Sequence, residues 1–302
     1  MKLKKEMTLI TDERYKDPKT IPLIFRFEPH LFEDSLSRIR NSTFIHHEIG
    51  EKELYLIDGF FTEEEAVAMR EFSGKASFSR EIFASSESQQ RGQTPTCSMN
   101  SKEKWDFFAN PPAPVKEFYK LVALLSHILD VEITTFPWDL VQGKLCSPAV
   151  NTNRIREHSK ESVELDKHRD VDLEKKGIAF GIPILYGQEK AYFPNHFDNG
   201  AAGQPWLVTV MIYSTADNFH PEYGMGTVFY NEEGEISTRA ECLHMRMVLF
   251  EGDIIHSAEH SNLPAGVSTE RVSYVFKLTM NPKREDQSAK REFREILPSS
   301  SA

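Results

Sequence analysis

The segment "RVSYVFKLTM" at residues 271–280 alternates between two kinds of side chain. In an extended strand, one face would carry only apolar residues: Val272, Tyr274, Phe276, Leu278 and Met280. The opposite face would carry Arg271, Ser273, Val275 and Lys277. An apolar outer face needs a covering layer, whereas an inward arginine calls for an anion or a carboxylate. The segment therefore predicts a strand between a packed layer and a polar site.

The segment "WLVTVMIYST" at 206–215 behaves in the same way. Its first face is made for packing and consists of Trp206, Val208, Val210 and Ile212. Its second face consists of Leu207, Thr209, Met211 and Tyr213. Because Thr209 and Tyr213 carry hydroxyl groups, we expect this second face to line a pocket.

From about residue 148 onward, short strands separated by turns such as Asn199-Gly200 and Glu233-Gly234 are predicted. Besides the two above, they are "AVNTNRIREH" (149–158), "SVELDKH" (162–168), "AFGIPILYG" (179–187), "GTVFYN" (226–231), "STRAECL" (237–243), "MRMVLFEGD" (245–253) and "IIHSAEH" (254–260). Many short alternating strands are typical of a β-sandwich or barrel. The sequence thus predicts an N-terminal region (1–135), a β core (136–283) and a C-terminal tail (284–302).

Two helices are predicted in the first half of the chain. "FTEEEAVAMREF" (61–72) begins with Thr62 and has Glu65 three residues later, which is the pattern of a capping box. "APVKEFYKLVALLSHILD" (113–130) has one apolar helical face, formed by Val115, Phe118, Tyr119, Val122, Leu125 and Leu129. We expect both helices to cover the outer face of the sheet. The polar segment 84–112 between them is expected to be a long loop that closes over the site.

The composition of the chain excludes several classes of protein. It has 302 residues with 39% hydrophobic and 27% charged residues, which predicts a soluble globular protein. Its few, widely spaced cysteines favour a reducing cytoplasm. The net charge of −10 argues against a nucleic-acid partner. No apolar run approaches the roughly 20 residues that span a membrane, and the N-terminus does not resemble a secretory signal. The 3 cysteines form no Cys-x-x-Cys pair, so a disulfide framework or zinc ribbon is not expected.

Two His-x-Asp pairs are candidate metal ligands: His168 and Asp170 in "LDKHRDVD" (165–172), and His196 and Asp198 in "PNHFDNG" (194–200). Alternate residues of an extended chain point the same way, so either pair can supply two ligands. His256 in "LFEGDIIHSAEHS" (249–261) offers a third. Two histidines and one carboxylate form the facial triad of non-haem Fe(II) oxygenases.

Other interpretations of these residues are weaker. The triplet His-Arg-Asp at 168–170 also opens a protein-kinase catalytic loop, but that loop needs an asparagine where this sequence has Lys175. Taken singly, these residues are ordinary: a charged turn, a strand histidine and a surface arginine. Their occurrence together in one order favours the metal site.

The order of the motifs resembles that of the 2-oxoglutarate- and Fe(II)-dependent oxygenases, including prolyl-hydroxylase-like members. A His-x-Asp is followed by "VTVMIYST", "GMGTVFY", "VLFEGDIIHS" and "RVSYVFKL", and "LYLIDGFFTEEEAVAMREF" resembles the strand-then-helix opening of the prolyl-hydroxylase-like members. The resemblance covers roughly residues 54–280. It implies a double-stranded β-helix, a jelly roll of cupin-like type, with helices on the outer face of the major sheet.

The resemblance also implies cofactors and residue roles. Fe(II) would be held by His168, Asp170 and His256, and Arg271 with Ser273 and Tyr213 would bind 2-oxoglutarate. O2 would be the oxidant, with ascorbate as a candidate accessory reductant. The reaction implied is oxidation of a C–H bond in a small molecule or peptide. The carboxylate ligand argues for hydroxylation, because halogenases of this family lack it.

Two choices stay open at this stage. We favour His168 and Asp170 because Val163 and Leu165 alternate before them as in a buried strand, whereas 187–205 is rich in Gly, Pro and Asn. His196 and Asp198, which directly precede "WLVTVMIYST", are the second choice. The alternative functions are a cupin-like metal-binding isomerase and a non-catalytic ligand-binding jelly roll.

Overall fold

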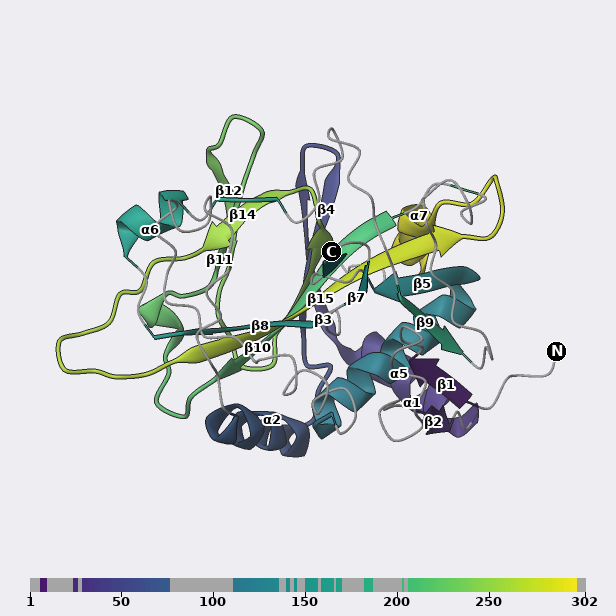
Figure 1. The fold of residues 1–302 in the computed structure, drawn as a ribbon, viewed down its shortest axis with the longest axis horizontal. Helices are drawn as coiled ribbons and strands as arrows, with labels where there is room; N and C mark the ends of the chain where they lie inside the picture. Colours follow the sequence, from purple (N-terminus) through teal and green to yellow (C-terminus); the bar gives the residue numbers. More distant parts are fainter. Residues whose placement is uncertain are drawn as a thin grey trace.

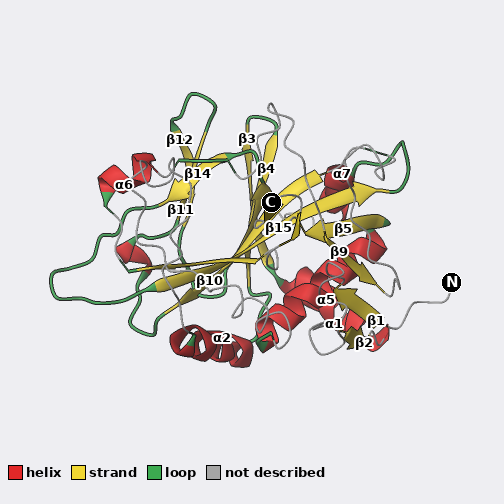
Figure 2. Cartoon of the chain, in the orientation of Figure 1, coloured by secondary structure: helices red, strands yellow, loops and turns green. Residues whose placement is uncertain are grey.

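The computed structural model describes residues 6–9, 24–26, 29–76, 111–135, 140–141, 144–145, 150–156, 159–165, 167–169, 182–186, 203 and 206–297. The described part is mostly β, with antiparallel sheets of the kind found in jelly rolls (Figures 1 and 2). Most of segment 84–112, together with Asp170, His196 and Asp198, lies outside the described residues. The expectations for them therefore stay predictions.

The larger sheet is built around β15 (Arg271–Pro282). One edge of β15 pairs along its length with β10 (Trp206–Thr215), and the other edge pairs first with β8 (Val150–Ile155) and then with β5 (Val131–Thr135). Beyond β10 lie β13 (Met247–Glu251), β4 (Lys52–Asp58) and β3 (Thr43–Ile49). Beyond β5 lie β9 (Ile182–Tyr186), β1 (Glu6–Leu9) and β2 (Ile24–Arg26).

A smaller sheet has the order β12 (Ile236–Ala240), β11 (Thr227–Tyr230) and β14 (Ile255–Ala258). An isolated antiparallel bridge between His168 and His256 adds one residue to its β14 edge. A separate hairpin pairs β6 (Leu140–Val141) with β7 (Lys144–Leu145).

The helices of the described residues are α1 (Pro29–Asn41), α2 (Glu63–Lys75), α5 (Ala113–Ile128), α6 (Lys160–Leu165) and α7 (Ala289–Ile296), and a 3-10 turn, η3, lies at Pro221–Tyr223. Figure 1 shows α2 and α5 along one side of the larger sheet, and the smaller sheet on the other. Among the described residues, no helix combines the length and apolar character needed to cross a membrane.

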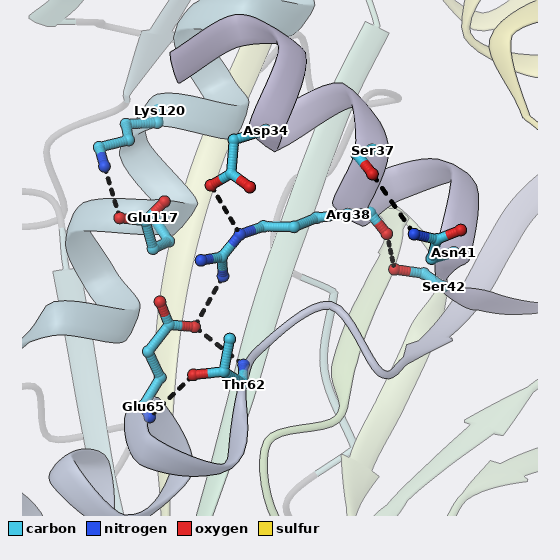
Figure 3. Close-up of polar contacts among 9 residues, drawn as sticks. All are labelled: Asp34, Ser37, Arg38, Asn41, Ser42, Thr62, Glu65, Glu117 and Lys120. Atoms are coloured by element: carbon cyan, nitrogen blue, oxygen red, sulfur yellow. Dashed lines mark hydrogen bonds and ion pairs between the residues drawn. The ribbon is translucent and has the colours of Figure 1, made fainter. Parts of the chain in front are cut away.

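The capping box expected at Thr62 is present at the start of α2. The Thr62 hydroxyl accepts from the Glu65 backbone N–H, and the Glu65 carboxylate accepts from the Thr62 backbone N–H. Figure 3 shows that Arg38 of α1 joins this cap, because its guanidinium donates to Glu65 at 2.8 Å and to Asp34 at 3.3 Å. The capping box therefore also ties α1 to α2.

Alternation along β10 and β15 separates two hydrophobic cores, as predicted. The outer core joins the even-numbered residues of both strands to α1, α2, α5 and α7, and the ring centroids of Phe118 and Phe276 are 4.6 Å apart. The inner core lies between the two sheets and includes Met211, Tyr213 and Val275. Because strand residues point alternately to the two sides, Arg271, Ser273 and Lys277 face the inside with Val275.

The strand predicted at 162–168 is wrong over most of its length, because residues 160–165 form helix α6. The Ser159 carbonyl accepts from the Val163 N–H at 3.3 Å. The pKa of Glu161 is lowered because the carboxylate accepts hydrogen bonds from its own backbone N–H and from Ser159. These local bonds at a helix start outweigh the alternation of two apolar residues. Of the described residues in this predicted strand, only His168 pairs with a strand.

Candidate functional site

The structure brings His168 and His256 side by side. Each backbone N–H donates to the carbonyl of the other, at 3.0 Å from His168 and 2.9 Å from His256. The two imidazole centroids are 4.4 Å apart and the rings are inclined by 52°. His256 is buried and His168 is exposed. Two imidazoles at this separation can turn a nitrogen each towards a shared ion.

The tautomer of the neutral His256 ring is set by a hydrogen bond to its own turn. Its Nδ1 lies 2.9 Å from the Ile254 carbonyl oxygen, which can only accept a hydrogen bond. In the neutral ring the proton is therefore on Nδ1, and the lone pair is on Nε2. Metal-binding histidines commonly show this arrangement, in which one ring nitrogen donates to a carbonyl and the other ligates. Phe250 packs against the ring at 4.8 Å and keeps this side of the site apolar.

Arg271 is a buried cation at the start of β15, with only 3% of its surface exposed. Its Nε donates to the Met225 carbonyl at 2.9 Å, and its Nη1 donates to the Ser273 hydroxyl at 2.6 Å. Within the described residues no carboxylate pairs with it. Since a buried charge is costly unless it is paired, this guanidinium is suited to an anionic ligand.

The Met225 carbonyl is held in place by a tight turn. Met225 has a positive φ of 61°, which is uncommon for a residue with a side chain. A Cβ on Gly226 would lie 2.2 Å from the Ala240 carbonyl oxygen, so only glycine fits there. "GMGTVFY" thus contains a tightly packed turn, which supplies an acceptor for Arg271. The role of Met225 was not predicted, although the flanking glycines signal a special backbone.

Tyr213 lies beside Arg271 on the inner face. The Arg271 guanidinium carbon is 5.5 Å from the centre of its ring. The Tyr213 hydroxyl is 2.6 Å from the Thr227 hydroxyl of the smaller sheet. Burial raises the pKa of Tyr213 well above its usual value, although the nearby Arg271 charge opposes the shift. The phenol therefore stays protonated, and Thr227, which was not predicted, links the two sheets at this point.

Strand β11 lies next to the surroundings of both Arg271 and His256 in the interior. Its Thr227 contacts Tyr213 beside Arg271, and its Phe229 lies opposite His256 in the register of β11 with β14. Thr227 and Phe229 point to the same side and are about 7 Å apart along the strand, at roughly 3.3 Å per residue. Strand β11 therefore connects the surroundings of Arg271 with those of His256.

The remaining predicted ligands are not tested by the described residues. Asp170, His196 and Asp198 lie outside them. Among the residues that the structure describes, no group of three His, Cys, Asp or Glu side chains could hold a metal ion. The two histidines are thus the described part of a candidate metal centre, and its carboxylate stays a prediction.

No protein-family model matches the sequence, and comparison with curated proteins gives no match. Among solved structures, the chain is similar to the non-heme alpha ketoglutarate dependent epimerase SnoN from nogalamycin biosynthesis. The sequence identity is 12% and the TM-score is 0.38, and the alignment covers 91% of this chain and 92% of that chain. It is also similar to HygX from Streptomyces hygroscopicus with nickel and 2-oxoglutarate bound (14%, TM-score 0.41, 78% and 84% covered). A third similar structure is a Pseudomonas putida prolyl-4-hydroxylase (8%, TM-score 0.35, 84% and 100% covered). Similarity at this level assigns neither an activity nor a substrate.

Proposed function

We propose that the chain is a 2-oxoglutarate- and Fe(II)-dependent dioxygenase. It would hydroxylate a C–H bond of a small molecule or a polypeptide side chain. One oxygen atom of O2 would enter that bond and the other would enter succinate, with release of CO2. The observation that carries the proposal is the buried Arg271, which faces the same interior as the paired His168 and His256 and has no carboxylate partner among the described residues.

The order of strands supports a double-stranded β-helix. From β8 to β15 the chain passes between the larger sheet and the smaller sheet. Strands β8, β9 and β10 belong to the larger sheet, β11 and β12 to the smaller, β13 to the larger, β14 to the smaller and β15 to the larger. His168, between β8 and β10, pairs with β14 and so continues the alternation. An interior formed in this way is a common place for a small ligand or a metal.

The donors present fit Fe(II). Two neutral imidazoles suit iron, and the hydrogen bond from Nδ1 to Ile254 leaves the His256 lone pair on Nε2. We propose Asp170 as the carboxylate ligand, with His196 and Asp198 as the alternative pair for His168 and Asp170. When bound, the iron supplies the chemistry that couples decarboxylation of 2-oxoglutarate to oxidation of a C–H bond.

The residues of the chain would orient the reactants. Arg271 would bind the far carboxylate of 2-oxoglutarate with the N–H groups that Met225 and Ser273 do not use. The protonated Tyr213 hydroxyl would stand beside that carboxylate as a further donor. Phe229 and Phe250, both fully buried, would keep water from the His256 side of the site.

The test is conversion of 2-oxoglutarate to succinate by the purified chain with Fe(II) and O2, with and without ascorbate. A panel of amino acids, peptides and small molecules should include compounds that increase turnover and acquire one oxygen atom. His256→Ala should abolish turnover. If 2-oxoglutarate with a divalent metal neither raises the melting temperature nor is consumed, the proposed function is wrong, and a ligand-binding jelly roll becomes the better interpretation.

A further inference from the structure

Arg169, the residue between the two members of the favoured His-x-Asp pair, is bound to the segment that carries His256. Its Nη1 donates to the Asp253 backbone carbonyl at 3.1 Å, and its Nη2 donates to the Glu232 carboxylate. Asp253 lies in the turn just before β14. The arginine thus adds a side-chain link to the backbone bridge that joins His168 to His256.

The acceptors of Arg169 are themselves held by a lysine from β4. Lys52 Nζ lies 2.7 Å from the Glu232 carboxylate and 3.0 Å from the Asp253 carboxylate. The pKa of Glu232 is lowered, first by the hydrogen bond from Lys52 and then by that from Arg169. An ion-pair network of this kind holds its geometry better than an isolated surface pair does. The network connects four separate segments of the chain, at residues 52, 169, 232 and 253.

Lys167, on the other side of His168, also binds the smaller sheet. Its Nζ lies 4.2 Å from the centre of the Tyr230 ring, and Tyr230 shares a hydrogen bond of 2.9 Å with Ser257 of β14. Successive residues of an extended segment point to opposite sides, so Lys167 and Arg169 share one side of the chain. With Lys167 and Arg169 both engaged, His168 is left to point the other way, and its ring meets that of His256.

We propose that Arg169 is a positioning residue, whose links to Asp253 and Glu232 fix the orientation of His168 towards His256. The proposal has a part that concerns the metal-free chain and a part that rests on the proposed function. In the metal-free chain Arg169 holds the bridge between the two histidines. In the loaded protein it would raise metal affinity, because partners that orient a ligand typically contribute roughly 10–100-fold.

The first experiment measures backbone amide exchange in the metal-free full chain. Arg169→Gln should speed exchange of the His168 and His256 amides severalfold, because both donate across the bridge. The matched control is Arg239→Gln on β12, an exposed arginine that pairs with Glu259 at 3.5 Å and does not contact the bridge. Unchanged exchange in Arg169→Gln overturns the proposal. Melting of the metal-free variants checks the fold, and the milder Glu232→Gln serves if Arg169→Gln does not fold.

The second experiment titrates each variant with Co(II) and follows its visible absorption. Arg169→Gln should weaken Co(II) binding by roughly tenfold or more, Arg169→Lys should restore part of it, and Arg239→Gln should stay within twofold of the parent. Equal affinities for all variants overturn the metal part of the proposal. If the parent itself binds no Co(II), the proposed function fails with that part, while the exchange experiment still decides whether Arg169 positions His168.

Discussion

Replacing Arg271 with leucine tests the anion-binding end of the site directly. In the structure this guanidinium is buried and oriented by two acceptors, the Met225 carbonyl and the Ser273 hydroxyl. Leucine keeps part of the apolar stem but removes the positive charge and every N–H donor. The expected result is weak 2-oxoglutarate binding with unchanged metal binding, because the contacts of Arg271 are with Met225, Ser273 and Tyr213 and not with the two histidines.

The size of the effect follows from the burial of Arg271. Removing one partner of a buried, hydrogen-bonded charge pair costs about 2–5 kcal/mol, much of it from the charge left unpaired. At about 1.4 kcal/mol per tenfold, this is a loss of roughly 30-fold to several thousand-fold in 2-oxoglutarate affinity. Ser273→Ala removes only one hydrogen bond that orients the guanidinium. Its cost should be about 1 kcal/mol, or roughly fivefold.

The assay is calorimetric titration of 2-oxoglutarate into the chain loaded with Ni(II), which does not turn over. A parallel metal titration shows that the metal end is intact. Melting of each metal-free variant separates a binding defect from unfolding, since Arg271→Leu also leaves the buried Met225 carbonyl without its donor. If Arg271→Leu binds 2-oxoglutarate as tightly as the parent while remaining folded, the guanidinium does not hold the cosubstrate and the argument from its burial is wrong.

Three further predictions follow from the geometry. His256→Ala should abolish Co(II) binding, whereas His196→Ala should preserve it. If His196→Ala loses the metal while replacement of His168 and Asp170 has no effect, the metal site is formed by His196 and Asp198 instead. Gly226→Ala should destabilise the fold by about 1–3 kcal/mol in chemical denaturation, because the new Cβ would clash with the Ala240 carbonyl oxygen. The control Gly74→Ala in helix α2 should be neutral or stabilising, because a Cβ there would meet no other atom within 4 Å. Cys242, whose pKa burial raises to about 12, should resist alkylation at pH 8 in the folded chain and react in denaturant, as followed by peptide mass spectrometry.

The features that the sequence predicted best are those encoded by local periodicity. Alternation in 206–215 and 271–280 predicted which side chains face the helices and which face the interior. The helical face of 113–128 and the Thr62 cap were also predicted from the sequence, because both depend on residues within one or two helical turns of each other. Neither pattern required knowledge of which strands pair.

Features that depend on contacts between distant segments were missed. The Met225 carbonyl reaches Arg271 from a turn whose shape depends on the close approach of Ala240 to Gly226. Thr227 meets Tyr213 only because the two sheets face each other. No single stretch of sequence contains these pairs, although the spacing Gly-Met-Gly indicated an unusual backbone.

The prediction for His168 and the error in the segment before it have a common origin. Local hydrogen bonds at Ser159 favour a helix over residues 160–165, so the strand that was expected to carry His168 to the sheet does not form. His168 still pairs with His256, which means that its place is set by contacts outside its own segment. The links of Arg169 to Asp253 and of Lys167 to Tyr230 are those contacts. These contacts are the basis for our proposal that the neighbouring charged residues orient His168, although from the sequence alone they resemble an ordinary solvated charge run.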